Sequence, residues 1–134
     1  MSLDQALADV IKNVPECLAA GWVDMSTGML LGVKTVDSHP QEILDMVAAA
    51  TGDLFQGSNV SAIESMWRRA RGVKDDGNHY FRQVIVLSEN LIHVFLRGQK
   101  AQDQVLVCVA RISANLGMVL TKARTELSRV EAKA

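Results

Sequence analysis

Four basic residues in one short segment are the side chains best suited to bind an anion. Arg68, Arg69, Arg71 and Lys74 follow one another closely in a chain whose 14 Lys and Arg and 15 Asp and Glu residues give a formal charge of -1. A guanidinium group binds a carboxylate or a phosphate through two parallel hydrogen bonds, so the segment is a candidate docking patch for an acidic protein surface or a nucleotide phosphate. The alternative is that these cations only stabilise the C-terminus of a helix, which contributes about 0.3–1 kcal/mol.

Other residue types that carry chemistry are present but form no catalytic or metal-binding motif. The sequence has no phosphate-binding loop, no GxSxG nucleophile turn and no HExxH zinc motif. His39, His79 and His93 lie far apart, each without a second ligand at metal spacing. Cys17 lies in an apolar run with no basic neighbour to lower its pKa, and Asp24 is placed to accept backbone N–H groups of its own turn. We therefore expect no enzyme activity, no cofactor and no bound metal.

Length and composition predict a single domain over residues 1–134, because 49% hydrophobic residues are enough for one core. The charge lacks the basic excess that binding to nucleic acid needs. No apolar run is long enough to span a membrane, and the first residues lack the pattern of a signal peptide. Cys17 and Cys108 alone do not indicate a disulfide framework. We expect a cytoplasmic protein that neither binds nucleic acid nor inserts into a membrane.

The first third of the chain predicts a helix followed by a β-hairpin. Apolar residues recur at helical spacing from Leu3 to Val14, with Ser2 and Gln5 placed as a capping box. Strand-like runs at residues 17–25 and 29–36 then flank a Ser-Thr-Gly turn.

A second helix is predicted from residue 41 to residue 55, with Ser38 and Gln41 placed as a capping box and Pro40 in the first turn. An interruption is predicted at residues 57–59, where Gly, Ser and Asn disfavour a helix interior. A new apolar stripe then includes Ile63, Met66 and Trp67, and Ser61 with Glu64 resembles another capping box. The pattern fits either one kinked helix or two consecutive helices.

Three strands and a final helix complete the chain. The strands are predicted at residues 80–87, 91–96 and 104–110, and their short connections indicate an antiparallel meander. The run at 104–110 has apolar residues at both odd and even positions, which is typical of a central strand covered on both faces. Apolar residues from Leu116 to Val130 then form the stripe of an amphipathic helix.

This order of elements, together with the first hairpin at residues 21–31, resembles the roadblock/dynein light chain family. The hairpin has an apolar strand, an acidic residue entering the turn, a glycine and a second apolar strand. The resemblance implies an α/β (α+β) fold of the roadblock/profilin-like type. In that fold a five-stranded antiparallel sheet is sandwiched between helices, with the long helix on one face and both terminal helices on the other.

The resemblance also implies a symmetric homodimer, because family members pair their third strands edge to edge and pack their long helices together. These elements map onto residues 80–87 and 41–55. The expected interface residues are Val47, Ala48, Thr51, Phe55, Phe81, Gln83 and Ile85. Alternating apolar residues on the strand and small residues at 48–50 fit this expectation. The alternative is that these are ordinary core positions of a monomer.

The leading functional hypothesis is a non-catalytic module that regulates or scaffolds a small Ras-like GTPase. The resemblance implies it, since bacterial relatives bind such GTPases as homodimers and stimulate hydrolysis by ordering the GTPase's own residues. A second hypothesis is a small-molecule sensor, with Trp22, Met25, His93 and Phe95 as candidate pocket residues. A third is an adaptor of a motor or membrane complex, whose partner would bind regardless of nucleotide.

Overall fold

The computed structural model describes residues 2–37, 41–72, 74 and 81–134, and the side chains of residues 41–45 are outside this description. The elements follow one another in the order expected from the sequence. They are α1 (Leu3–Asn13), β1 (Cys17–Asp24), β2 (Met29–Thr35), α2 (Gln41–Gln56), α3 (Ser58–Ala70), β3 (Gln83–Leu87), β4 (Leu91–Arg97), β5 (Gln104–Arg111) and α4 (Leu116–Lys133).

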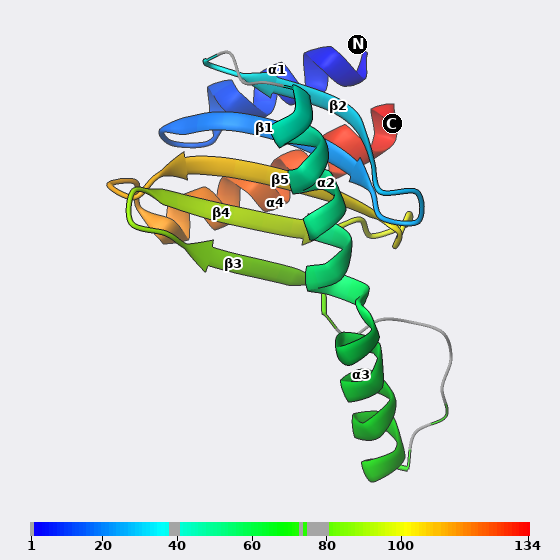
Figure 1. The fold of residues 1–134 in the computed structure, drawn as a ribbon. Coiled ribbons are helices and arrows are strands. Elements are labelled where there is room, and N and C mark those ends of the chain that lie inside the picture. Colours follow the sequence, from blue (N-terminus) through cyan, green and yellow to red (C-terminus); the bar gives the residue numbers. More distant parts are fainter. Residues whose placement is uncertain (1, 38–40, 73, 75–80) are drawn as a thin grey trace.

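The five strands form one antiparallel sheet in the order β2-β1-β5-β4-β3 (Figure 1). β5 lies at the centre of the sheet and is covered on both faces, which confirms the prediction of a central strand made from its apolar run. β2 and β3 form the two edges. A sheet of this order places residues of β1, β5 and β4 at the centre of the core, and it leaves β3 with one row of backbone groups unpaired by the described residues.

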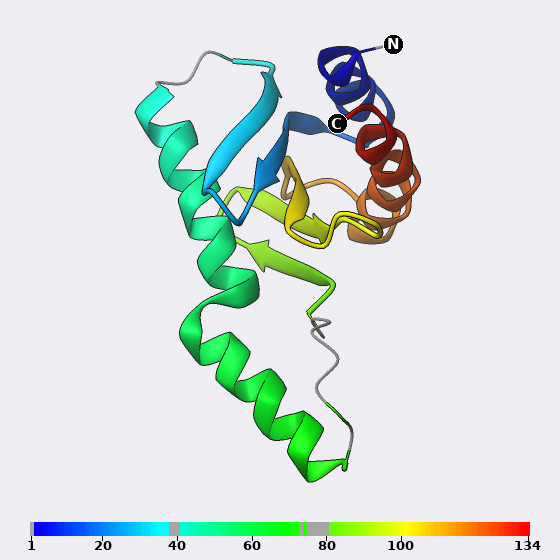
Figure 2. The ribbon, with the colours of Figure 1, turned by 90° about the vertical axis from the view of Figure 1, so that its right-hand side faces the viewer.

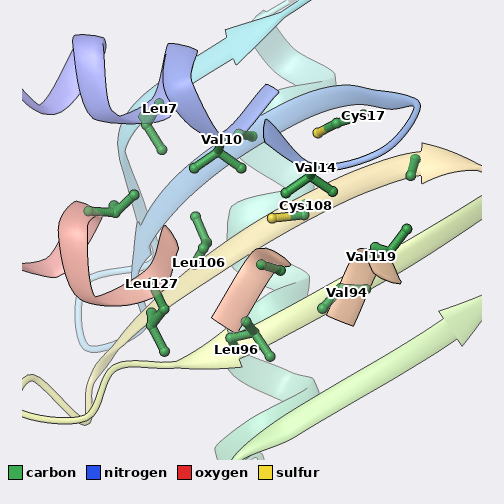
Figure 3. Packing of buried hydrophobic residues seen from close by; sticks show 14 of the residues in the cluster. Leu7, Val10, Val14, Cys17, Val94, Leu96, Leu106, Cys108, Val119 and Leu127 are labelled. Carbon is green, nitrogen blue, oxygen red and sulfur yellow. The ribbon is translucent and has the colours of Figure 1, made fainter. Parts of the chain in front are cut away.

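α1 and α4 cover one face of the sheet (Figure 2). Leu7 and Val10 of α1 and Val119 and Leu127 of α4 point toward the strands and pack against the cluster that includes Leu106 (Figure 3). Burial of each such side chain contributes about 1.5–3 kcal/mol. This side is a continuous apolar layer between two helices and the sheet.

α2 lies on the opposite face, so the sheet is sandwiched between helices as the resemblance implied (Figures 1 and 2). Its Ala48 and Phe55 pack against a smaller buried cluster that includes Phe95 and Val107. The α+β fold with a five-stranded antiparallel sheet is therefore confirmed.

The break after α2 is a separation into two helices. Gln56 ends α2, and Gly57 caps the start of α3 with an extended backbone and no side-chain hydrogen bond. The capping box predicted at Ser61 and Glu64 is therefore wrong, because α3 begins three residues earlier, at Ser58. The predicted box at the N-terminus of α1 is half right, since Ser2 Oγ accepts a hydrogen bond from the Gln5 N–H. The predicted cap residues Ser38 and Pro40 lie outside the described residues.

Candidate interaction surface

The free edge of β3 exposes apolar side chains. Ile85, Val86 and Leu87 are 37%, 39% and 57% exposed, although they belong to the five-residue strand that ends the sheet. An exposed apolar edge strand pairs readily with another strand, and proteins usually block such edges with charges or cover them. The Cα register places Ile85 opposite Val94 and Val86 opposite His93, so both faces of this edge carry apolar groups.

Gln83 and Phe81 are held by contacts inside the chain. The Gln83 Oε1 accepts hydrogen bonds from Nε and Nη2 of Arg124 at 3.3 and 3.0 Å, which links the start of β3 to α4. Phe81 lies two residues before the strand and packs partly buried against the cluster under α2. The strand predicted at residues 80–87 is therefore shorter than expected, and Tyr80 lies outside the described residues.

α2 has one side that faces the sheet and another that faces solvent. Ala48, Thr51 and Phe55 are fully buried within the single chain. The Thr51 hydroxyl donates to the Val47 carbonyl oxygen of its own helix at 2.8 Å. Val47 is 43% exposed, and together with the exposed Met46 and Leu54 it forms an apolar side of α2. Four of the seven expected interface residues therefore lie at or near the surface, and three support α2 from within.

The basic segment divides into a buried and an exposed part. Arg68 is 6% exposed and engages a partner within the chain, as does its buried neighbour on the helix, Glu64. Arg69, Arg71 and Lys74 are exposed at and beyond the C-terminus of α3. The cations therefore lie near the C-terminus of a helix, where the helix dipole favours positive charge. Three of them are accessible to an anionic partner.

Arg97 is a buried residue that sequence reasoning missed. It is 3% exposed, and its Nη2 and Nη1 donate to the carbonyl oxygens of Phe55 at 3.2 Å and Gln102 at 3.3 Å. The guanidinium lies 5.1 Å from the centre of the Phe55 ring. Burial lowers the pKa of Arg97, while the carboxylate of Glu64 acts in the opposite direction. Arg97 thus ties the end of α2 to the turn between β4 and β5.

Beside α2, the same face of the sheet is hollowed by an apolar groove of about 300 Å³. Its lining includes Leu18, Val33, Val47, His93, Phe95 and Val109. Two of the four candidate pocket residues, His93 and Phe95, therefore meet in one groove. Trp22 does not, because it is fully buried on the α1/α4 side with its Nε1 donating to Gln104 Oε1 at 2.9 Å. Met25 is buried in the cluster under α2 but does not line the groove.

His93, Cys17 and Asp24, candidates for chemistry that lie within the described residues, each have a defined environment. Burial lowers the pKa of His93, whose Nε2 lies 3.2 Å from Ser88 Oγ, and burial raises the pKa of the Cys17 thiol. Asp24 Oδ1 accepts from the Ser26 N–H and hydroxyl at 2.9 and 2.6 Å, which is the expected turn role. The described residues include no group of three His, Cys, Asp or Glu side chains placed to hold a metal. His39 and His79 lie outside them.

Solved structures of roadblock domains share this arrangement. A Roadblock/LC7 domain from Streptomyces avermitilis is 18% identical with a TM-score of 0.65, over 98% of this chain and 97% of that chain. MglB from Myxococcus xanthus is 14% identical with a TM-score of 0.70, over 97% and 92% of the two chains. An MglB structure with a tetrameric arrangement is 19% identical with a TM-score of 0.68, over 97% and 85%.

The chain therefore has the fold of Roadblock/LC7 domains, which confirms the resemblance seen in the sequence at the level of the fold. No protein-family model and no curated protein matches the sequence. Within the described residues, no helix is long and apolar enough to cross a membrane.

Proposed function

We propose that this chain is a cytoplasmic, non-catalytic homodimeric module that regulates or scaffolds a small Ras-like GTPase, in the manner of a GTPase-activating protein. The observation that carries the proposal is the free β3 edge with exposed Ile85, Val86 and Leu87, which lies on the same molecule as the apolar outer side of α2. Such an edge favours pairing with an identical strand, because a two-fold axis then satisfies both rows of backbone groups at once.

In the proposed dimer, Val47 of α2 and Ile85 of β3 contact the second copy directly, while Ala48, Thr51 and Phe55 hold α2 in place on its own sheet. The fold shared with MglB, one of whose structures has a tetrameric arrangement, supports self-association. Size-exclusion chromatography with light scattering tests this part of the proposal. A monomer at micromolar concentration would contradict it.

The GTPase partner is proposed from the roadblock resemblance and from the chemistry of the surface. A module of this kind binds the GTPase and stabilises its switch loops, whereas the GTPase itself supplies the reacting groups. Exposed Arg69, Arg71 and Lys74 provide cations for an acidic surface or a phosphate. Arg68 is excluded from this patch because it is 6% exposed.

Affinity capture from the lysate of the source organism, with GDP or a non-hydrolysable GTP analogue, tests the GTPase part. A Ras-like GTPase captured mainly with the analogue supports a regulator that recognises the switch loops, and hydrolysis assays then measure its effect. Alanine replacement of Arg69, Arg71 and Lys74 weakens that capture if the patch contacts the partner. Equal capture with both nucleotides would instead indicate an adaptor, and capture of no GTPase would contradict this part of the proposal.

A second candidate function, small-molecule sensing, is favoured by the groove in which His93 and Phe95 meet. Native mass spectrometry and an absorption spectrum of the purified protein test it. An adduct that disappears in a Phe95→Ala variant supports a ligand site, and a protein of the bare chain mass without visible absorption counts against one.

A further inference from the structure

The apolar side of α3 is exposed. Ile63 and Met66 are 43% and 59% exposed, and Trp67 beside them is 59% exposed. These residues are three and four positions apart, so they form one stripe along the helix. α3 packs mainly against α2 and extends beyond the β3 edge of the sheet (Figures 1 and 2). Three large apolar side chains are thus carried outside the body of the molecule.

The position of α3 follows from the interruption at Gly57. A Cβ on this glycine would approach the Asp53 carbonyl oxygen to 2.9 Å, so the close passage of the chain favours glycine there. Arg97 then fixes the end of α2 through the Phe55 carbonyl oxygen, and the electrostatic attraction between Arg97 and Glu64 of α3 adds a link to the next helix. α3 is therefore directed by contacts that involve the sheet.

Pairing at β3 would place the second copy where α3 points. Two antiparallel neighbouring strands of one sheet are related by a two-fold axis perpendicular to that sheet, so the two copies present the same face to the same side. α2 and α3 of one copy then lie on the side that carries the groove of the other copy. The groove is apolar along most of its wall, and its lining includes Val33 of β2, Val47 of α2 and Leu91 of β4.

We propose that the apolar side of α3 from each copy packs into the groove of the other copy, so that α3 acts as an exchanged arm of the dimer. This inference rests on the proposed homodimer and adds to it a second, separate contact. The occupant of the groove is a second copy because α3 offers an exposed apolar stripe from the same chain, already located beyond the edge at which that copy pairs. Ile63 and Met66 supply the inserted side chains, and Val33, Leu91 and Val109 receive them.

Cross-linking between two differently tagged chains tests the arrangement. One chain carries Ile63→Cys and the other Leu91→Cys, and a short thiol cross-linker is added to the mixture. The natural Cys17 and Cys108 are both buried, which limits their reaction. The control chain carries Ser65→Cys, because residues two positions apart lie on different sides of a helix. We expect the mixed product to form at least about tenfold faster with Ile63→Cys than with Ser65→Cys.

A Met66→Glu variant provides the second measurement. Met66 is 59% exposed, so the substitution leaves the fold of the single chain intact. If α3 is buried in the partner, the dissociation constant of the dimer rises about tenfold or more. A dimer with equal cross-linking of both cysteines and an unchanged dissociation constant overturns the exchanged arm but not the homodimer. A wild-type monomer overturns the homodimer and the arm together. A small apolar molecule bound to the dimer by native mass spectrometry, with Met66→Glu silent, assigns the groove to a ligand instead.

Discussion

The two faces of the sheet differ in how completely the chain covers them. Among the described side chains, 17 buried residues form the cluster between the sheet and α1/α4, whereas seven form the cluster under α2. The first face has two helices packed across it. The second has α2, an open groove beside it, and exposed apolar residues on α2 and α3. At the β3 edge both faces are apolar, because Val86 lies on the α2 face whereas Ile85 and Leu87 lie on the α1/α4 face, opposite Val94 and Ile92. Away from the β3 edge, the first face is completed within the chain, whereas the second retains apolar surface of the kind that marks an interaction site.

This difference separates stability from association. Substitutions on the α1/α4 side are expected to change the free energy of unfolding, because they remove contacts within one molecule. Substitutions of the exposed apolar residues of α2, α3 and the β3 edge are expected to change the dissociation constant of the dimer and leave the single chain folded. The following experiments test that separation.

The two tryptophans give the largest contrast. Trp22 is fully buried on the α1/α4 side and donates to Gln104, so Trp22→Ala is expected to lower the free energy of unfolding by about 3–5 kcal/mol. Trp67 is 59% exposed on α3, and Trp67→Ala is expected to lower it by a smaller amount, about 1 kcal/mol or less, at a concentration where the chain is monomeric. Urea denaturation followed by circular dichroism measures both. Similar losses in the two variants would show that the faces are not distinct.

Arg97 is a buried polar link on the less covered face. Arg97→Met removes hydrogen bonds to the carbonyl oxygens of Phe55 and Gln102 and is expected to lower the free energy of unfolding by about 2–4 kcal/mol. The exposed neighbour Arg82 is the control, and Arg82→Met is expected to have an effect below about 0.5 kcal/mol. Denaturation curves compare the two. A loss no larger than that of the control would mean that Arg97 does not hold the end of α2.

A substitution on the β3 edge tests association without a change in the fold of the single chain. Ile85→Lys places a charge on the unpaired strand, which natural proteins use to prevent edge pairing. The dissociation constant is expected to rise about 10- to 100-fold, while the circular dichroism spectrum stays unchanged. Glu89→Lys, in the exposed turn after the strand, is the control and should leave the dimer intact. Light scattering over a dilution series measures both, and equal effects would point to net charge as the cause.

The turn between β4 and β5 is held by the α1/α4 side. Glu131 of α4 accepts hydrogen bonds from the N–H groups of Lys100 and Ala101. A Cβ at Gly98 would meet the Ala101 carbonyl oxygen at 2.5 Å, so Gly98→Ala is expected to lower the free energy of unfolding by about 1–3 kcal/mol. Gly28→Ala keeps a φ of +71° but meets no atom within 4 Å, so it measures backbone strain alone, about 1 kcal/mol. A smaller loss at Gly98 than at Gly28 would contradict the close contact.

Most of the fold was predictable because the spacing of apolar residues within a segment indicates whether that segment forms a helix or a strand. The central place of β5 followed from its apolar run, and the break at Gly57 followed from helix propensity. The start of α3 was missed because its cap is a backbone feature of Gly57 and not a side-chain pair. Each of these outcomes depends on local sequence.

The site was predictable only in part, because burial depends on tertiary contacts. Thr51 and Val47 lie on the same side of one helix and look alike in sequence, yet Thr51 is fully buried whereas Val47 is 43% exposed and lines the groove. Arg97 ends an apolar strand and gave no sign that the Phe55 carbonyl oxygen, 42 residues away in sequence, would be its acceptor. His93 and Phe95 share the groove because they alternate on one strand, whereas Trp22 lies on the other face.

His93 gives the smallest expected effect and tests the groove in particular. Burial lowers its pKa below the ordinary value of 6.5, so the folded chain holds the imidazole neutral while the unfolded chain takes up a proton first. The free energy of unfolding should therefore fall as the pH drops through 6.5 and level off below the lowered pKa. His93→Gln should flatten this part of the profile. Asp37 is a charged residue that also lines the groove, so Asp37→Asn controls for the effect of its charge on the profile.

The same titration distinguishes an open groove from one filled by a second copy. If the dimer covers His93 further, its pKa should be lower in the dimer than in the monomeric Ile85→Lys variant, because desolvation disfavours the imidazolium ion. NMR titration of the imidazole signals measures both values. Identical pKa values in dimer and monomer would mean that the groove stays open to water in the dimer, and that the apolar side of α3 is buried elsewhere or not at all.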